Sequence, residues 1–295
     1  MTVTVPTGGD AHAIHTAIAS LLPTGGVVAL AGTHDLGATT VIVPPNVTLQ
    51  GDGWGTNLTG AANPLIRLTG SASSVRHLAI VGEPPTAIQV TGPDAWIEDV
   101  FLQRPDVGVS IFGTGRTTIQ RLHGQPRTYG LLLDKVEDVV RANDVHFWPY
   151  SGDLTLAAQG TAICLRRADN PQLSNIFAYG YAVGLELGAS AYGCAHKVHL
   201  ANADFDSCHR AIVVDAGQLA PTLFGACVTG QHPIKTPALP AIDLVSCGRA
   251  LLTLTSCQFL LYSARVARAP AASQAVVTVD GTVVVGASSD QEDAA

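Results

Sequence analysis

A short apolar pattern returns about every 22 residues along most of this 295-residue chain, beginning at Leu65. Each copy places two apolar residues on either side of a single position, which is the alternation of a β-strand. The successive pairs are Ile66/Leu68, Ile88/Val90, Val109/Ile111, Leu131/Leu133, Ile163/Leu165, Leu185/Leu187, Ile212/Val214 and Ile242/Leu244, spaced by 22, 21, 22, 32, 22, 27 and 30 residues. This period predicts coils stacked into a solenoid, because no single unit can bury its apolar edge alone.

The composition agrees with many short, buried strands joined by tight turns. Apolar residues make up 47% of the chain and charged residues 13%, and there are 30 glycines and 17 prolines. The net charge is −7, and the only lysines are Lys135, Lys197 and Lys235. Because nucleic-acid binding needs clustered basic residues to neutralise phosphates, we expect no nucleic-acid partner.

A second strand is expected in every coil. Its inward column is Leu78, Val100, Leu122, Val145, Ile176, Val198, Cys227 and Cys257, spaced by 22, 22, 23, 31, 22, 29 and 30 residues. The next residue of each coil must point outward, since side chains alternate across a strand. That outward column is Ala79, Phe101, His123, His146, Phe177, His199, Val228 and Gln258. The alignment predicts that His123 and His146 are neighbours about 4.8 Å apart, with His199 two coils further on.

The breaks in the period show where the chain leaves the solenoid. The two registers together place three insertions between a second strand and the following first strand, at Trp148–Gly160, Ala201–Arg210 and Gly230–Pro240. All three are therefore expected at one corner. Insertions gathered on one side of a repeat protein usually mark its binding face.

The N-terminal region differs from the repeats. Residues 10–22 carry apolar side chains at helical spacing, with Asp10 at the N-cap position and Pro23 as a stop signal. We expect a capping helix over 10–22, opening strands over 27–60 and stacked coils over 65–287. These form a single β-helix domain over 1–287, followed by a polar C-terminal tail over 288–295.

Two stretches resemble a known superfamily. The segment PTGGVVALAGTHDL (23–36), followed by TTVIVPPNVTLQGDGWGTNL (39–58), is similar to the first strands of pectate-lyase-like proteins. GLLLDKVEDVVRANDVHFWPY (130–150) resembles bacterial and phage β-helix proteins related to tailspikes. The resemblance implies an all-β, right-handed parallel β-helix. Lyases, hydrolases, epimerases and non-enzymes share this fold, so the resemblance leaves the activity open.

The predicted binding rim is rich in aromatic and polar side chains. Its candidate substrate-binding residues are Arg127, Tyr129, Trp148, Tyr150, Asp153, Tyr179, Tyr181 and His209. An exposed Trp or Tyr offers a sugar ring a flat apolar face, while an arginine binds a uronate carboxylate or a pair of hydroxyls. The alternative is that the aromatic side chains pack the loops onto the solenoid.

Four residues are candidates for catalysis: Asp204, Asp206, His146 and His199. Asp204 and Asp206 alternate along one stretch, so their side chains can point the same way. Paired carboxylates cleave glycosidic bonds as acid with base or nucleophile, or bind Ca²⁺. The alternative for each aspartate is a turn in which it bonds nearby backbone amides. The two histidines are candidates for general acid–base work near neutral pH.

The cysteine pattern argues against a metal centre. The six cysteines form no C-x-x-C pair and have no finger-like histidine spacing, so we expect no zinc site. Cys227 and Cys257 fall in the inward column and are expected to be buried, reduced thiols. We predict no cofactor, with Ca²⁺ at the aspartate pair as the alternative.

No apolar run approaches the ~20 residues of a membrane span, so we expect no membrane partner. The N-terminus has neither the charged nor the apolar region of a signal peptide. The sequence therefore leaves three locations open: cytoplasmic, virion-associated, or secreted after a signal was trimmed.

Three functions fit these observations. The first is a carbohydrate-active enzyme, of polysaccharide lyase or glycoside hydrolase type, acting on a polysaccharide or oligosaccharide in a groove at the loop-bearing edge. The second is a non-catalytic glycan-binding or structural β-helix of a tailspike-like or surface assembly. The apolar outward residues Leu132, Val213 and Val228 favour packing in a homotrimer for that function. The third is an intracellular enzyme acting on a small molecule.

Overall fold

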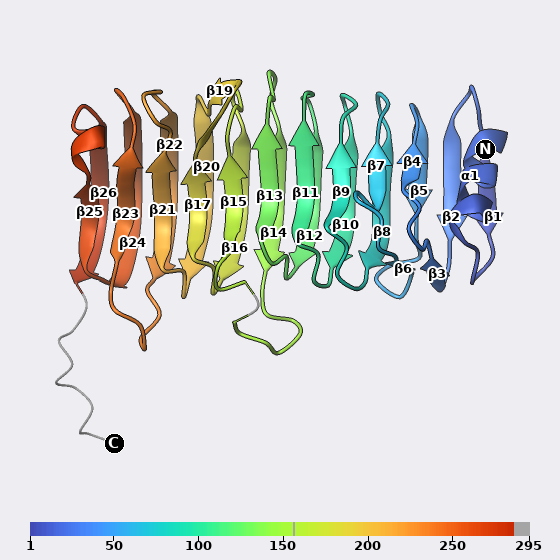
Figure 1. The fold of residues 1–295 in the computed structure, drawn as a ribbon, viewed down its shortest axis with the longest axis horizontal. Helices are drawn as coiled ribbons and strands as arrows, with labels where there is room; N and C mark the ends of the chain where they lie inside the picture. The colour runs from blue at the N-terminus through green and yellow to red at the C-terminus, as the bar shows by residue number, and fades with distance from the viewer. Residues whose placement is uncertain (156, 286–295) are drawn as a thin grey trace.

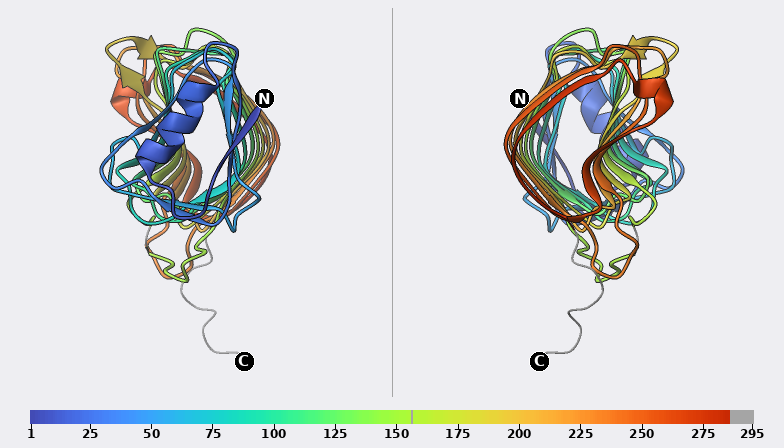
Figure 2. Two further views of the ribbon diagram at one scale, coloured as in Figure 1. Left: turned by 90° about the vertical axis from the view of Figure 1, so that its right-hand side faces the viewer. Right: turned by 90° about the vertical axis from the view of Figure 1, so that its left-hand side faces the viewer.

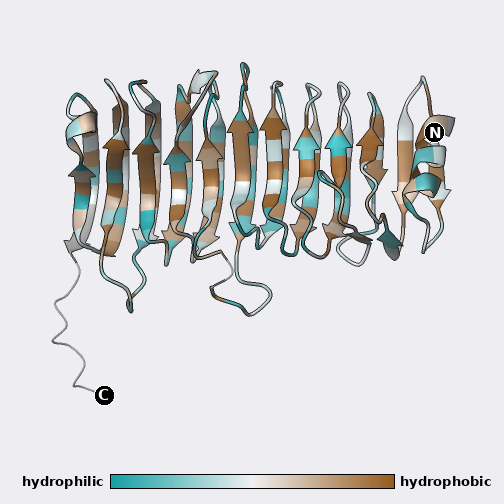
Figure 3. Ribbon diagram, viewed as in Figure 1, coloured by the Kyte–Doolittle hydropathy of each residue, from teal (hydrophilic) through white to brown (hydrophobic). Residues whose placement is uncertain are grey.

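The computed structural model describes residues 1–155 and 157–285, which form a parallel β-solenoid of about 11 turns (Figure 1). Two sheets run the length of the solenoid, with 14 and 10 strands, and neighbouring strands within each sheet are parallel. Figure 2 looks along the long axis and shows the coils stacked around a common interior. Apolar segments recur in the strands along the solenoid (Figure 3).

The larger sheet contains β1 (Thr2–Val5), β2 (Gly26–Leu30), β3 (Thr33–Asp35), β5 (Val47–Gln50), β6 (Asn57–Thr59), β8 (Ser74–Ile80), β10 (Trp96–Leu102), β12 (Thr118–Gly124), β14 (Arg141–Phe147), β16 (Gln172–Tyr179), β20 (Val198–Asp206), β22 (Thr222–Gln231), β24 (Leu251–Tyr262) and β26 (Val276–Val285). The smaller sheet contains β4 (Val41–Val43), β7 (Ile66–Leu68), β9 (Thr86–Val90), β11 (Val107–Phe112), β13 (Tyr129–Asp134), β15 (Thr161–Leu165), β17 (Val183–Leu187), β21 (Arg210–Asp215), β23 (Pro240–Ser246) and β25 (Ala264–Arg268).

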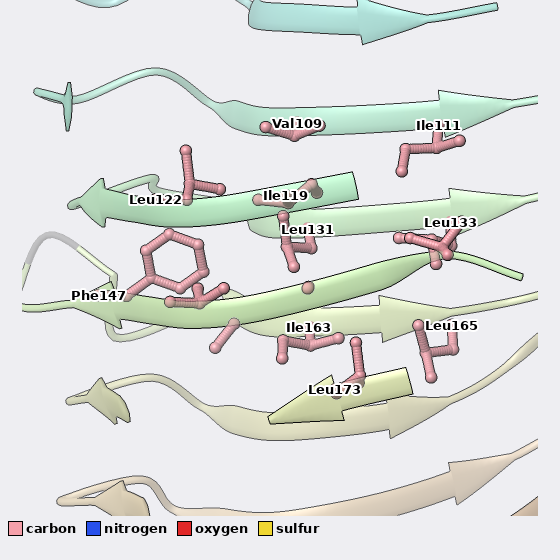
Figure 4. Packing of buried hydrophobic residues seen from close by; sticks show 14 of the residues in the cluster. Val109, Ile111, Ile119, Leu122, Leu131, Leu133, Phe147, Ile163, Leu165 and Leu173 are labelled. Carbon is pink, nitrogen blue, oxygen red and sulfur yellow. The ribbon is translucent and has the colours of Figure 1, made fainter. Parts of the chain in front are cut away.

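The predicted first-strand column is confirmed in the smaller sheet. Each leading residue pairs with its counterpart in the next coil, from Ile66 through to Ile242. All sixteen side chains of the predicted pairs are fully buried. Figure 4 shows some of them, Val109, Ile111, Leu131, Leu133, Ile163 and Leu165, packed against inward residues of the larger sheet that include Ile119, Leu122 and Leu173. Each such side chain stabilises the fold by about 1.5–3 kcal/mol, which explains why apolar residues recur at every turn.

A bend divides the strands of the larger sheet. Eight of these strands, β8, β10, β12, β14, β16, β20, β22 and β24, each contain one bend residue with a positive φ of 52–58°: His77, Asp99, Arg121, Asp144, Asn175, Asn202, Cys227 and Ser256. Asparagine and aspartate tolerate this left-handed conformation better than most residues. Asn202 Nδ2 donates to Asn175 Oδ1, and Asn175 Nδ2 donates to Asn143 Oδ1, both at 2.7 Å. The bend gives the larger sheet two outer faces, one before it and one after it.

The predicted second-strand column is correct as far as Ile176 and again at Cys257, but it is wrong at Val198 and Cys227. Ile176 pairs with Ala203 rather than Val198, and Ala203 pairs with Val228. Val198 is buried too, but it pairs with Leu223 nearer the start of the strand. Cys227 takes the left-handed position and is exposed, so the prediction of a buried thiol there is wrong. Cys257 is buried as predicted.

The register differs because one insertion lies at the opposite corner. The extra residues of that coil form the antiparallel hairpin β18 (Ala189–Ser190) and β19 (Gly193–Cys194), before β20 begins. The predicted insertion at Ala201–Arg210 is therefore wrong, because β20 continues through Asp206. The other two predicted insertions are confirmed as loops along the lower edge in Figure 1, while the hairpin lies at the upper edge.

Two outward positions change as a result. Asp204 and Thr229 occupy the places predicted for His199 and Val228. Val228 points inward and is fully buried, so it offers no apolar surface to another subunit. Val213 retains 8% exposure and Leu132 is half-buried.

The single α-helix of the described residues, α1 (Ala11–Ser20), lies within the predicted range of 10–22. Asp10 Oδ1 accepts a hydrogen bond from Ala13 N at 2.9 Å, as an N-cap does. The buried face of α1 includes Ile14 and Ile18 and packs against β1, β2 and β4. Its role in capping the solenoid stays a prediction, as do the limits of the domain, and the predicted tail at 288–295 lies outside the described residues.

The six cysteines are free thiols. Burial is the main cause that raises the pKa of Cys164 and of Cys208 to about 12, so both remain protonated and unreactive. No helix in the described part of the chain is long and apolar enough to cross a membrane.

Candidate functional site

A row of outward side chains follows the bend on consecutive strands of the larger sheet. We call this row the outer column: Phe101, His123, His146, Phe177, Asp204 and Thr229. Each residue is the direct register partner of the next. Neighbouring members therefore stand about 4.8 Å apart along the solenoid. The predicted contact between His123 and His146 is confirmed, with ring centroids 5.4 Å apart.

A second outward row lies two residues further along the same coils, nearer the loop-bearing edge. Tyr179 pairs with Asp206, so both side chains point to the same side as Phe177 and Asp204. Trp148 follows β14 and contacts Tyr179, with ring centroids 4.8 Å apart. The two rows together bring the predicted residues His146, Trp148, Tyr179, Asp204 and Asp206 onto one surface.

Two loop residues extend this surface. Trp54 lies over the first members of the outer column, with centroids 5.1 Å from Phe101 and 5.2 Å from His123. Tyr150 turns back over the column, 5.1 Å from Phe101. We call the resulting set of eight rings the aromatic face: Trp54, Phe101, His123, His146, Trp148, Tyr150, Phe177 and Tyr179. Trp54, Trp148 and Tyr150 remain 39–40% exposed, so flat ring surfaces are open to solvent.

The buried side-chain amide of Gln125 holds the loop that carries Trp148 and Tyr150. Gln125 is 3% exposed and its Nε2 donates to the Asp153 carbonyl at 2.6 Å. Its Oε1 accepts from the backbone N and the hydroxyl of Ser151, at 3.1 and 2.6 Å. Asp153 Oδ1 in turn accepts from the backbone N and the hydroxyl of Thr155. The predicted ligand Asp153 therefore takes part in shaping the loop, and the rings above are held in place before any ligand binds.

His146 lies at the centre of the aromatic face. Its Nδ1 is 2.6 Å from the Tyr150 hydroxyl. Burial, followed by the neighbouring His123, lowers the pKa of His146, while Asp144 opposes the shift. Burial and then Asp144 raise the pKa of Tyr150. At neutral pH the pair is therefore an uncharged imidazole hydrogen-bonded to an uncharged phenol.

Asp204 and Asp206 follow directly on the last rings of the aromatic face. Both are half-buried, and as alternate residues of β20 they lie about 6.6 Å apart along the strand. Burial is the main cause that raises the pKa of Asp204; the charge of Asp206 adds to the shift and Thr229 opposes it. The Ser207 hydroxyl donates to Asp206 Oδ1 at 3.1 Å. The pair thus combines the Asp204 carboxyl, whose pKa is raised mainly by burial, with the Asp206 carboxyl, which accepts a hydrogen bond from Ser207.

Several predicted site residues lie elsewhere. His199 is on the other outer face of the larger sheet, where it stacks on Phe224 with centroids 5.8 Å apart. Tyr181 is only 1% exposed, and its hydroxyl donates to the Pro126 carbonyl at 2.8 Å. It is therefore a core residue and offers no ring to a ligand. His209 stacks on the buried His232 at the corner after β20, with centroids 5.9 Å apart.

Two further predicted substrate-binding residues, Arg127 just before β13 and Tyr129 at its start, already interact with other side chains. Arg127 forms ion pairs with Glu83 at 3.0 Å and Asp106 at 2.7 Å. Tyr129 belongs to the smaller sheet and lies under the guanidinium of Arg166, 5.9 Å from its ring. Neither belongs to the aromatic face.

Four residues of the aromatic face are absent from the site residues predicted from the sequence: Trp54, Phe101, His123 and Phe177. The last three do fall in the predicted outward column, so the repeat period already indicates that they lie on this surface. Trp54 precedes the repeats and lies in the loop between β5 and β6, where the period gives no position.

The described residues contain no group of three or more His, Cys, Asp or Glu side chains arranged to hold a metal ion. Asp204 and Asp206 supply two carboxylates, whereas Ca²⁺ takes six to eight oxygen ligands.

No family model and no curated protein sequence matches this chain. Solved structures do. A tailspike protein of E. coli bacteriophage HK620, in complex with a pentasaccharide, has a TM-score of 0.68 at 11% identity, covering 96% of this chain and 64% of that one. Endo-xylogalacturonan hydrolase from Aspergillus tubingensis has a TM-score of 0.65 at 13% identity, covering 96% and 92%. PfbA, a surface adhesin of Streptococcus pneumoniae, has a TM-score of 0.55 at 10% identity, covering 94% and 93%.

These structural neighbours are pectate-lyase-like right-handed β-helix proteins, which confirms the resemblance stated from the sequence. They include enzymes that act on carbohydrates as well as an adhesin. Identities of 10–13% establish the shared fold alone.

Proposed function

We propose that this protein is a glycoside hydrolase that binds a polysaccharide along the aromatic face and cleaves it at Asp204 and Asp206. The observation that carries the proposal is the register of β16 and β20. It places Asp204 beside Phe177, and Asp206 beside Tyr179, in the two rows that form the face. Sugar rings stacked on the aromatic side chains would extend directly to the two carboxyls.

The electrostatics divide the work between the two aspartates. Asp204, with its raised pKa, donates a proton to the glycosidic oxygen as the C–O bond breaks. Asp206 acts as the carboxylate that attacks the anomeric carbon or deprotonates a water. In either case the hydroxyl of water ends on the anomeric carbon, and its remaining proton returns to the pair. The distance between the Asp204 and Asp206 carboxyl groups when the substrate is bound decides between direct attack by the carboxylate and attack by water.

Hydrolysis fits this surface better than elimination. Removing a proton next to a uronate carboxylate requires a positive group to stabilise the charge that develops. Arg127, the cation predicted to bind a uronate carboxylate or a pair of hydroxyls, forms ion pairs with Glu83 and Asp106. The open outer surface of a sheet also suits a polymer better than a small molecule, which is normally enclosed in a pocket.

A screen of polysaccharides tests the proposal by measuring new reducing ends and unsaturated products separately. We expect reducing ends without unsaturated products. Asp204→Asn and Asp206→Asn should each lower the rate by about 10²–10⁴-fold, since each removes a proton-transfer or nucleophilic group. Asp215→Asn, at the end of β21 in the smaller sheet, is the matched control and should retain the wild-type rate. Unchanged turnover in both site variants would remove the assignment.

A second function is favoured by the extent of the aromatic face. Its rings span β10, β12, β14 and β16, whereas the carboxylates occupy β20 alone. A surface of this kind binds a glycan whether or not it is cleaved. Binding of a polysaccharide with no cleavage by the wild-type protein would identify a non-catalytic glycan-binding protein.

A further inference from the structure

The aromatic face lies on only one side of the two carboxylates. Four members of the outer column precede Asp204 toward the N-terminal end, and all four carry rings. On the other side the same position is occupied by Thr229, which is half-buried, and then by Gln258, which is exposed. A ligand that crosses Asp204 therefore meets stacking surfaces in one direction and small or flexible polar groups in the other.

We call Phe101, His123, His146 and Phe177 the aromatic arm. Its length sets the number of sugar units that it can hold. From Phe101 to Asp204 the column advances by four strand spacings, which is about 19 Å. One pyranose unit of an extended glycan is comparable in length with one strand spacing. The arm therefore accommodates about four units, and Trp54 closes its far end over Phe101.

The charges around the arm select against acidic glycans. Asp144 lies beside the column, with Oδ1 3.7 Å from His123 Nε2, and Asp204 and Asp206 stand at its end. The cation nearest in sequence to the column, Arg121, is shared between Glu98 at 3.6 Å and Asp99 at 3.7 Å. The carboxylate of a uronic acid on this column would thus meet Asp144, Asp204 and Asp206, while Arg121 is already paired with two acidic side chains.

We infer that the ligand of this surface is an extended neutral glycan, bound with about four sugar units on the aromatic arm and one or two beyond the carboxylates. The inference rests on the site proposed above but not on its catalytic activity. If cleavage occurs, it separates a long fragment, held by the rings, from a short one that dissociates readily.

Binding measurements on Asp204→Asn test this, because the variant leaves a ligand intact. The probes are neutral gluco-, manno- and xylo-oligosaccharides of about two to seven units, compared with oligogalacturonates and oligoalginates of equal length. We expect the dissociation constant of a neutral series to fall with each added unit up to about five or six. The acidic series should bind more weakly at every length.

A second substitution locates the far end of the arm. Trp54→Ala in the Asp204→Asn background should weaken binding of the longest neutral oligosaccharides by about three- to tenfold and leave the shortest unchanged. Trp96→Ala, a tryptophan of equal 40% exposure on the other outer face, should change neither. Tighter binding of the uronates, no dependence on length, or no neutral binding would overturn the inference.

The outcomes separate the two proposals. If neutral oligosaccharides bind more tightly with length but the wild-type protein cleaves none, the proposed hydrolase activity is refuted and the proposed neutral ligand is supported. If the protein cleaves an oligouronate and the cleavage requires Asp204, the hydrolase activity is supported and the proposed neutral ligand is refuted.

Discussion

Inward residues of the larger sheet pack in the core, whereas outward residues of the same strands form its surface. On β14 and β16 the inward members Val145 and Ile176 are buried, while the residues that follow them, His146 and Phe177, belong to the outer column. The two sets differ by a single position, because side chains alternate across a strand. The inward set holds the coils together, and the outward set presents a surface that the fold does not require. Stability and binding should therefore respond to different, adjacent residues.

The largest difference is expected between two neighbouring leucines. Leu131 is fully buried, whereas Leu132 points outward and is half-buried. Leu131→Ala should lower the free energy of unfolding by about 2–5 kcal/mol, since it removes contacts and leaves a cavity. Leu132→Ala should lower it by about 1 kcal/mol or less. Urea unfolding measures both, and equal losses would contradict the assignment of inward and outward sides.

The next difference is in binding and concerns two tryptophans. Trp148 and Trp96 are 39% and 40% exposed, but only Trp148 belongs to the aromatic face. Trp148→Ala should weaken glycan binding by about tenfold, because a stacked ring contributes up to about 1.5 kcal/mol. Trp96→Ala should leave it unchanged. Calorimetric titration with the best-bound polysaccharide provides the comparison, and equal effects would place the ligand on another surface.

The proximity of the two carboxyls of β20 predicts that substituting one changes the pKa of the other. Because the charge of Asp206 helps to raise the pKa of Asp204, Asp206→Asn should move that pKa downward. Titration of the carboxyl carbons by NMR measures the shift. A control at Asp153→Asn, in the loop, should leave the pKa of Asp204 in place. An upward shift in Asp206→Asn would show that the two carboxyls do not repel each other.

The same pKa has a consequence for stability. A pKa raised by folding means that the protonated form of Asp204 is the one the fold favours. Its contribution is present at low pH and is lost as the pH rises through the folded-state pKa. Asp204→Asn should therefore flatten the decline in the free energy of unfolding over that range. Urea unfolding at several pH values measures it, and an unchanged slope would contradict the burial of the charge.

The smallest effect is expected from removing one hydroxyl. Tyr150→Phe keeps the ring over Phe101 but loses the hydrogen bond to His146 Nδ1, at 2.6 Å. The free energy of unfolding should fall by about 0.5–1.5 kcal/mol, with little loss of glycan affinity. Tyr192→Phe, at an exposed tyrosine of the hairpin corner, is the control. If the two variants were indistinguishable, the hydrogen bond would not contribute to holding the loop.

The period of the sequence predicts the solenoid and one complete column. It fails in the second column at a definite point. The spacing of 27 residues between Leu185 and Ile212 shows that residues were added but not at which corner. Val198 suits an inward position better than Ala203 by its side chain, so the apolar pattern favours the wrong register. The correct register becomes clear from the structure, where the extra residues of this coil form the hairpin at Ala189–Cys194, before β20.

The residues of corners and loops follow no period. Tyr181 turns into the core, where a backbone carbonyl accepts from its hydroxyl, while Tyr150 turns out over the outer column. Composition does not distinguish these two directions, since both side chains have an apolar ring and a polar tip. Asp204 shows the converse. Its carboxyl group makes it a candidate from the sequence alone, and the structure adds that it lies beside Phe177.

A crystal structure of Asp204→Asn with a bound neutral oligosaccharide tests the central claim most directly. We expect sugar rings over the exposed rings of Trp54, Tyr150 and Trp148, with one glycosidic oxygen within hydrogen-bonding distance of position 204. An oligosaccharide bound instead on the outer face of the smaller sheet, or beside His199, would contradict it.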